Sequence, residues 1–345
     1  MLRTGSVGAV HEDGVSLVLK VVTAILPITL FASNAGAATY KVLYSFGGSP
    51  EAPVYPLAGL IMDKNGNLYG TTGGRENAGT GGTVFELSPG PDGAWTETVI
   101  HEFDGAGVYP QAGLVLDASG NLYGTTFGGG PDGKSAGEGV VFELSPAAAG
   151  TWTETVLHSF SGPDGSHPTA GLVFDGEGNL YGTTSDGGPY SYNAESGGVV
   201  FELSPAGGGK WTKAVLHDFG AGTDGSYVIS GLIVDAAGNL YGTTEYGGSG
   251  GASKEGTAFE LTPSEGGVWT ETVLHNFGSG ADGENPKAGL ALDGAGNLYG
   301  ETSYGGRAVR ARYSSWSHSR EGDGRRRLCI VSVTSAPAGW NRREA

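Results

Sequence analysis

Short apolar stretches alternate with glycine-rich polar stretches along most of this chain. One of them, "DKNGNLYGTT" at residues 63–72, returns four more times with small changes. Its last asparagine recurs at residues 67, 121, 179, 239 and 297, so the spacings are 54, 58, 60 and 58 residues. A period of this length indicates a tandem-repeat architecture.

Each period contains four strand-like segments and shows no helical periodicity. In one period they are "TETVLHSF" from Thr153, "AGLVFD" from Ala170, "NLYGTT" from Asn179 and "GVVFELSP" from Gly198. All four are short, rich in β-branched or aromatic residues, and bounded by Gly, Pro, Asp or Asn. Four strands in about 60 residues fit the blade of a β-propeller better than a solenoid coil, which spends fewer residues per turn.

The predicted fold class is therefore all-β, a β-propeller-like array of four-stranded antiparallel blades. Counted from the "TETVIHEF" type of segment, the blades begin near residues 40, 95, 152, 211 and 269. Four of these blades are complete. The fifth is truncated, because no "VFELSP" segment follows its "NLYGETS".

The repeated Asp-x-x-Gly-Asn motif suits a tight hairpin turn. Asp63 can accept hydrogen bonds from turn amides, and Gly66 can adopt the positive φ that a short hairpin loop needs. The alternative is a calcium loop, but the motif lacks the run of acidic ligands that an oxygen cage requires, and its middle positions vary freely. We therefore expect a structural turn and no metal site.

Together, the motifs "NLYGTT", "VFELSP" and "WTETVLHSF" resemble the GloVer-type tandem repeat found in secreted bacterial proteins with varied surface anchors. The resemblance covers roughly residues 40 to 306 and implies an exported, propeller-like repeat protein. It implies no established activity and no catalytic residues.

The N-terminal region predicts export. An apolar run from Val21 to Phe31 follows Lys20 and precedes the small residues Ala35-Gly36-Ala37, as in a secretory signal peptide. The run is too short to span a bilayer, and Pro27 interrupts it. We assign residues 1–38 to a signal peptide and residues 39–306 to the repeat domain, which we expect outside the cytoplasm without stable insertion in a membrane.

Residues 307–345 differ from everything before them. They hold nine of the 19 basic residues, all arginine, and three of the 36 acidic ones. One interpretation is a basic arm for nucleic acid or an anionic surface. We favour a frameshift, because codons can be chosen for residues 307–318 so that the shifted frame reads "GGTGTVFELEP". On this interpretation the tail is disordered and no nucleic-acid partner is expected.

The repeated histidines and aromatics have structural explanations. Each histidine shares a strand face with apolar residues, and rings on neighbouring blades would be too far apart to ligate one ion. We expect packed, hydrogen-bonded histidines and aromatics that fill the layers between blades. The histidines are His101, His158, His217 and His275, and the tryptophans that begin corresponding strands are Trp95, Trp152, Trp211 and Trp269.

Candidate binding residues lie where the repeats differ. The loops between "YGTT" and "VFEL" vary in length and charge, and one of them carries Tyr190 and Tyr192, the best candidates to stack on a sugar. The alternative is that they are exposed loop tyrosines without a ligand. A second candidate set is Asp164, Asp224 and Asp282 in "DGSHP", "DGSYV" and "DGENP", where turn capping is the alternative.

No enzyme signature is present: the chain has no nucleophile elbow, no HExxH motif and no phosphate loop, and its single cysteine, Cys329, lies outside the repeats. We therefore predict a secreted binding or display module for a carbohydrate or cell-surface component, with no cofactor and no catalytic residues. The alternative is a polysaccharide-active propeller enzyme, a hydrolase or lyase, whose paired carboxylates would be assembled in space.

Overall fold

The computed structural model describes most of the repeat region. The described residues are 41–46, 55–74, 81–130, 137–191, 197–249, 255–278 and 283–304, and the strands 315–320 and 326–331. All strands belong to the unit Tyr44–Ala345. The predicted signal peptide lies outside the described residues, and within them no helix has the length and apolar character to cross a bilayer.

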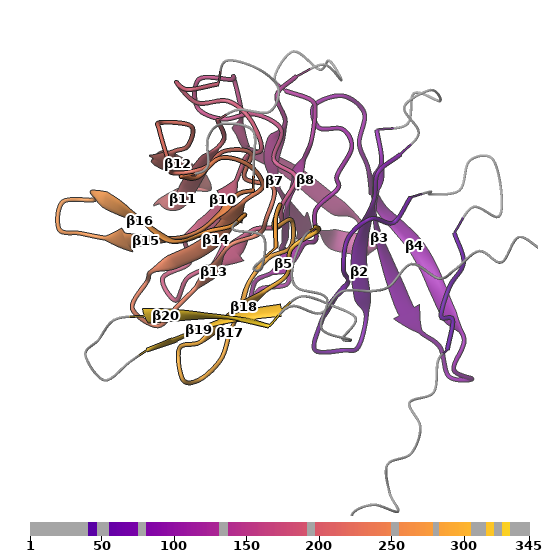
Figure 1. The fold of residues 1–345 in the computed structure, drawn as a ribbon. Coiled ribbons are helices and arrows are strands. Elements are labelled where there is room, and N and C mark those ends of the chain that lie inside the picture. Colours follow the sequence, from indigo (N-terminus) through magenta and orange to yellow (C-terminus); the bar gives the residue numbers. More distant parts are fainter. Residues whose placement is uncertain are drawn as a thin grey trace, which may run out of the picture. The chain divides into compact units, whose positions relative to one another are not determined.

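The strands form five antiparallel four-stranded sheets, which we call blades and number in chain order (Figure 1). In each blade, strands that are consecutive in the chain are also neighbours in the sheet. Blade 1 comprises β1 (Ile61–Met62), β2 (Leu68–Thr72), β3 (Thr83–Pro89) and β4 (Trp95–Glu102). Blade 2 comprises β5 (Val115–Leu116), β6 (Leu122–Thr126), β7 (Val140–Pro146) and β8 (Trp152–Ser159).

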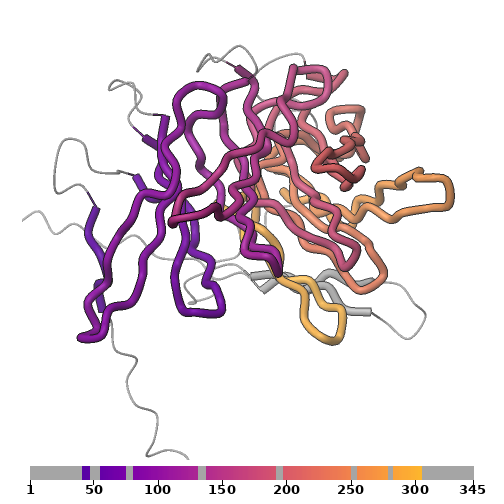
Figure 2. Tube along the Cα trace, turned by 180° about the vertical axis from the view of Figure 1, so that it is seen from behind, coloured from indigo at the N-terminus to yellow at the C-terminus, as the bar shows by residue number. Residues whose placement is uncertain are grey.

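Blade 3 comprises β9 (Val173–Phe174), β10 (Leu180–Thr183), β11 (Val199–Gly207) and β12 (Lys210–Asp218). Blade 4 comprises β13 (Ile233–Val234), β14 (Leu240–Thr244), β15 (Thr257–Pro263) and β16 (Trp269–Asn276). Blade 5 comprises β17 (Ala291–Leu292), β18 (Leu298–Gly300), β19 (Ser315–Arg320) and β20 (Arg326–Val331). A short 3-10 turn, Ala148–Gly150, links β7 to β8. Consecutive repeats follow one another in chain order in both views (Figure 2).

These blades confirm the predicted fold class, but they correct the predicted phase of the repeat. The "TETV" segment closes a blade as its fourth strand, after a hairpin from "VFELSP", instead of opening the next one. In the four complete blades the fourth strand also carries a β-bulge that the sequence does not predict. In blade 2, for example, Val141 pairs with His158 and Phe142 with Val156, so that Leu157 is unpaired.

The tail needs a second correction. The repeat motif supplies only β17 and β18 of blade 5, as predicted, but β19 and β20 come from the basic tail. Backbone pairing of Leu298 with His318 and of Ser317 with Cys329 places them as the third and fourth strands. These two segments of the tail therefore lie in strands, where the sequence predicts a disordered tail. The rest of the tail lies outside the described residues.

The hairpin turns have the predicted chemistry. In blade 3 one carboxylate oxygen of Asp175 accepts the backbone N–H groups of Glu177 at 2.8 Å and Asn179 at 2.9 Å. The other accepts the Asn179 side-chain amide at 2.8 Å and the Tyr181 hydroxyl at 3.0 Å. Gly178 has a φ of 90°, which L side chains rarely adopt. A single aspartate therefore fixes both the turn and the strand that follows it.

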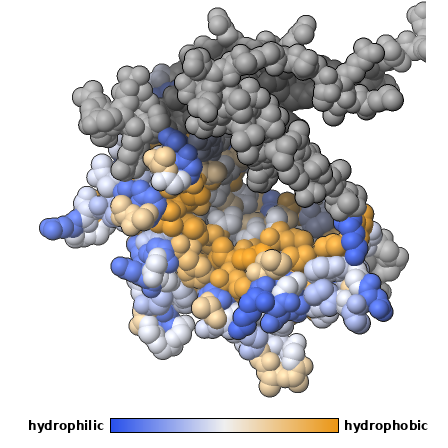
Figure 3. Space-filling view, turned by 90° about the horizontal axis from the view of Figure 1, so that it is seen from below, coloured by the Kyte–Doolittle hydropathy of each residue, from blue (hydrophilic) through white to orange (hydrophobic). Residues whose placement is uncertain are grey.

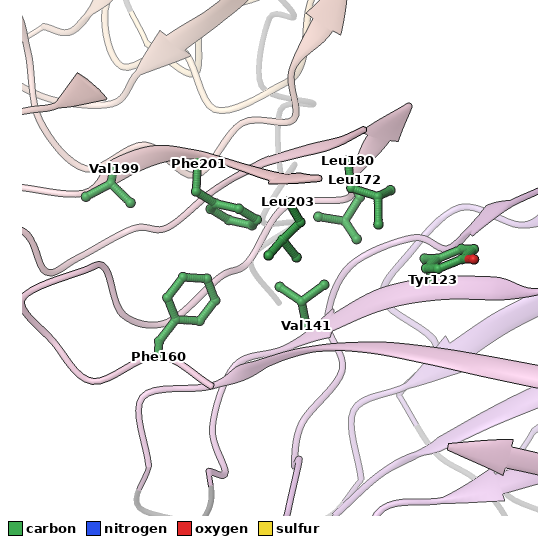
Figure 4. Packing of buried hydrophobic residues seen from close by; sticks show 8 residues of the cluster. All are labelled: Tyr123, Val141, Phe160, Leu172, Leu180, Val199, Phe201 and Leu203. Atoms are coloured by element: carbon green, nitrogen blue, oxygen red, sulfur yellow. The ribbon is translucent and has the colours of Figure 1, made fainter. Parts of the chain in front are cut away.

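Buried side chains from both faces of each blade form the core. Between blades 2 and 3, Val141 and Phe160 of one blade meet Leu172, Phe201 and Leu203 of the other (Figure 4). The "LYGT" glycine permits close packing within a blade, because a Cβ on Gly182 would lie 2.5 Å from Cζ of Phe201. Three further clusters of the same kind involve the other blades.

The same polar and aromatic contacts recur between blades. The Thr183 hydroxyl of blade 3 donates to the Ser230 carbonyl at the start of the next repeat, at 3.1 Å. Corresponding bonds join Thr71 to Ala112, Thr125 to Ala170 and Thr243 to Ala288. Tyr181 packs edge-on against Trp269 with ring centroids 6.1 Å apart, and the same contact recurs in earlier repeats, which confirms that these aromatics fill the layers between blades.

Apolar side chains are not all covered. Seen from below, hydrophobic residues gather around a hollow, with hydrophilic residues at its rim (Figure 3). On blade 1, Leu60 is 49% exposed, whereas its counterparts Leu114, Leu172 and Leu232 are 5–6% exposed because each packs on the preceding blade. In the described segment before blade 1, Phe46 packs on Phe85 with ring centroids 4.8 Å apart, and the Tyr44 hydroxyl lies 3.5 Å from Glu97.

Candidate functional site

One end of the blades carries the variable loops. Here the second strand of each blade ends and the third begins, and the fourth strand leads into the next repeat. Both sets of predicted site residues belong to these loops. Tyr190 follows β10, while Asp164 follows β8 and Asp224 follows β12. Tyr192 and Asp282 lie outside the described residues.

At this end, one residue in each repeat has a left-handed backbone. Their φ values are 54–62°, a conformation that costs a side chain about 1–2 kcal/mol. At His167, the N–H donates to the Glu138 carbonyl at 2.8 Å and the carbonyl accepts from the Ser185 N–H at 3.2 Å. These bonds join two repeats and fix the backbone. The five residues are Tyr55, Tyr109, His167, Tyr227 and Asn285.

His167 also carries a polar cluster. Its ring stacks on Phe127 at 4.5 Å and lies 3.5 Å from the Asp186 carboxylate and 3.7 Å from that of Glu138. The hydrogen bond with Asp186 raises the pKa of His167 above its usual value, against the opposing effect of burial. This cluster is half-buried and stabilises the junction of the two loops.

The repeated histidines pack as predicted. Each ring contacts the phenylalanine two residues later edge-on, as His158 does with Phe160 at 4.9 Å. Nε2 of His158 lies 2.8 Å from Asp164, and Nε2 of His217 lies 3.3 Å from Asp224. Within the described ranges, no group of three or more His, Cys, Asp and Glu side chains has the geometry to hold a metal ion.

A second polar position, in the fourth strand of the following blade, faces His101, His158 and His217. It is Glu154 opposite His101, with 3.6 Å between His101 Nε2 and the Glu154 carboxylate. In the preceding contact, Glu97 faces Tyr44 at 3.5 Å. Burial raises the pKa of both glutamates above the usual value. This position was not predicted as a site residue, although the "WTETV" segments of all four complete blades carry a charged residue there.

The charge of the side chain at this position changes sign in one blade. In blade 3 it is Lys213, whose ammonium lies 3.0 Å from Asp164 Oδ2 and also donates to the Asp164 main-chain carbonyl. Burial raises the pKa of Asp164, but hydrogen bonds from Lys213 and Ser161 outweigh it and hold that pKa well below its usual value. Burial lowers the pKa of Lys213 despite the neighbouring carboxylate. The Asp164 carboxylate is therefore already paired with a cation of the chain itself, Lys213.

Between blades 3 and 4 the position is Glu271, and here a pocket opens. The pocket has a volume of about 520 Å³ and is lined by Tyr190, His217, Asp218, Asp224 and Glu271, among others. We call it the Asp224 pocket. The structure thus brings together Tyr190 and Asp224, two of the predicted site residues, and leaves Asp164 in the preceding interface.

The Asp224 pocket is strongly acidic and incompletely satisfied. Asp224 is only 8% exposed, and its Oδ1 atom has no hydrogen-bond partner. Oε1 of Glu271 is likewise buried without a partner. Burial raises the pKa of Glu271, the nearby His217 lowers it, and the negative charge of Asp224 raises it further. Two buried carboxylate oxygens therefore lack hydrogen-bond partners in a pocket that is also lined by Tyr190, which is 37% exposed.

These features define a class: an all-β tandem-repeat protein of propeller-like blades, with a polar pocket where two blades meet. The model of the Gloeobacter/Verrucomicrobia repeat family matches residues 29–193 and 131–311. The chain therefore belongs to this family, as the resemblance of its motifs predicted. No curated protein matches the chain.

Several solved structures resemble the chain, all at low sequence identity. PorZ, a surface component of the type-IX secretion system of Porphyromonas gingivalis, is 13% identical with a TM-score of 0.41, over 82% of this chain and 42% of PorZ. A protein of unknown function from Dyadobacter fermentans is 12% identical with a TM-score of 0.40, over 79% and 93%. A GH32 β-fructofuranosidase from Bombyx mori is 9% identical with a TM-score of 0.41, over 78% and 60%. This chain thus spans less than half of PorZ.

Proposed function

We propose that this protein is an exported carbohydrate-binding module of the cell surface, and that the Asp224 pocket holds one unit of a saccharide. The observation that carries the proposal is an open pocket lined by two carboxylates, of Asp224 and Glu271, and by the ring of Tyr190. Sugar hydroxyls donate to such oxygens, and an aromatic ring packs against the C–H face of a sugar.

The size and position of the pocket support this role. A volume of about 520 Å³ falls within the range of small-molecule sites. The pocket is open on one side, next to the variable loops, so a longer chain can extend from it over the surface. The predicted signal peptide supports export.

The direct test is saccharide binding to the full chain, by glycan array followed by calorimetry. We expect Tyr190→Ala to weaken binding about 3- to 10-fold through loss of the ring contact, and Asp224→Asn by at least about tenfold. Tyr304, an exposed tyrosine of blade 5, provides the matched control, and Tyr304→Ala should leave binding unchanged. If the wild-type chain binds no saccharide on the array, the proposal is wrong.

A second candidate is a polysaccharide-active enzyme, because Asp224 and Glu271 come from different strands and loops yet line one pocket. A carboxyl group whose pKa is raised, as at Glu271, can act as a general acid beside an ionised partner. Release of reducing ends from polysaccharides, abolished in Glu271→Gln, would support this function. Binding that persists without any turnover would favour the module.

A further inference from the structure

The chain contains an internal copy of the Asp224 pocket that is already filled. Between blades 2 and 3, the Lys213 ammonium is held by the Asp164 carboxylate at 3.0 Å and by the Asp164 carbonyl, and it lies 5.2 Å from the centre of the Phe160 ring. His158 lies beside the same carboxylate. With 9% of its side chain exposed, Lys213 is a buried cation in a site built from one loop and one strand.

Between blades 3 and 4 the same frame recurs without its cation. Asp224 stands for Asp164 in the same Asp-Gly-Ser turn, and His217 and Phe219 correspond to His158 and Phe160. The Asp224 carbonyl corresponds to the Asp164 carbonyl that binds Lys213, and it accepts a hydrogen bond from the Thr257 hydroxyl at 3.2 Å. The difference lies in the following blade, where Glu271 replaces Lys213.

This replacement turns an occupied site into an open one. It removes the internal ammonium, adds a second carboxylate, and leaves Asp224 Oδ1 and Glu271 Oε1 buried without hydrogen bonds. Asp218 adds a third carboxylate to the lining, against the single imidazole of His217. Buried carboxylates of this kind are stabilised most by a cation that donates several hydrogen bonds.

We propose that the ligand of the Asp224 pocket is an amino sugar with a free ammonium group. Its nitrogen takes the place that Lys213 Nζ takes in the preceding interface and donates to Asp224 and Glu271. The sugar ring lies toward Tyr190. This inference rests on the proposed carbohydrate-binding function and adds the substrate class: a saccharide that carries a primary amine rather than an acetamide.

The test compares two probes with the full chain by calorimetry, a glucosamine tetrasaccharide and the matching N-acetylglucosamine tetrasaccharide. We expect the free amine to bind at least about tenfold more tightly. Glu271→Lys should abolish this binding, because the new side chain supplies the ammonium itself, as Lys213 does. Glu265→Lys makes the same charge change in an exposed turn and should leave binding intact. Thermal melting of both variants checks that they remain folded.

Four outcomes would refute the proposed amino-sugar ligand. They differ in whether the carbohydrate-binding function and the location of the site are refuted with it. Equal binding of both tetrasaccharides refutes the ammonium but keeps the carbohydrate-binding function. Binding of neither tetrasaccharide, nor of any other saccharide, refutes both. A lysine peptide or simple diamine that binds as tightly as the amino sugar refutes the saccharide as ligand. A folded Glu271→Lys variant that still binds the amino sugar refutes the location.

Discussion

The hairpin turn of blade 3 allows the role of a repeated aspartate to be measured. Asp175→Ala removes the acceptor of four hydrogen bonds, from two backbone amides, the Asn179 side chain and the Tyr181 hydroxyl. At about 1 kcal/mol each the loss would be about 4 kcal/mol, but the exposed Glu177 amide can bond to water instead. We therefore expect about 2–3 kcal/mol, or a fall in Tm of about 5–10 °C.

The dependence on pH provides a second check of the same change. Burial raises the pKa of Asp175, but hydrogen bonds from Asn179 and the turn amides outweigh it and lower the pKa below 3.8. A depressed pKa means that the carboxylate stabilises the fold above its unfolded pKa and that this contribution is lost as the pH falls through the folded pKa. The difference between wild type and variant should thus be full at pH 7 and shrink only below 3.8.

The assay is urea denaturation and thermal melting at pH 7 and at a pH below 3.8, with and without millimolar calcium. The slope with urea should be the same for both proteins, so that the shift in midpoint reports stability alone. Asp92→Ala, in an exposed turn between β3 and β4, is the control. The reasoning is refuted if Asp175→Ala costs less than about 0.5 kcal/mol, or if calcium raises the Tm of the wild type but not of the variant.

Three further predictions address packing, burial and the tail. Gly182→Ala should cost about 1–3 kcal/mol, because its Cβ would lie 2.5 Å from Phe201, whereas Gly176→Ala meets nothing within 4 Å and serves as the control in the same denaturation assay. Glu154→Gln should stabilise the fold at pH 7.5 by about 0.5–1 kcal/mol and have no effect well below pH 4.5. The reason is that burial raises the pKa of Glu154, so the wild type loses stability when this carboxyl group ionises as the pH rises. Urea midpoints at pH 7.5 and well below pH 4.5 check this. Sequencing the coding DNA after Gly306 should reveal "GTVFEL" or a close variant in the shifted frame, and its absence would rule out the frameshift.

The fold was largely predictable because its signals are local and repeated. Strand segments, turn residues and the period all follow from neighbours in sequence, as the Asp175 turn illustrates. The phase of the blade was missed although the loop lengths indicate it. Five residues separate Pro146 from Trp152, whereas thirteen separate Ser159 from Val173, and the shorter connection favours the hairpin in which Pro146 pairs with Trp152. The bulge at Leu157 depends on pairing across the sheet and has no signal in the local sequence.

The candidate site was predictable only in part. Tyr190 and Asp224 were identified because their loops vary between repeats, and both line one pocket. Glu271 was missed because it lies in a "WTETV" segment, and the same segment with the same glutamate occurs in blades 1 and 2. Its importance depends on the pocket that it shares with Asp224 of the previous blade, 47 positions earlier in the sequence.

The left-handed residues have a consequence for engineering. At His167 and three of its counterparts, backbone hydrogen bonds to the loops on either side hold the main chain, whatever the side chain is. At Tyr55 the carbonyl accepts one such bond, from the Gly73 N–H. The chain itself uses Tyr, His and Asn there, so the identity of the residue can change while the loop keeps its path. A library randomised at these five positions would therefore vary the chemistry of one surface on a constant scaffold, and asparagine or glycine would be the natural starting residues because they tolerate the conformation best.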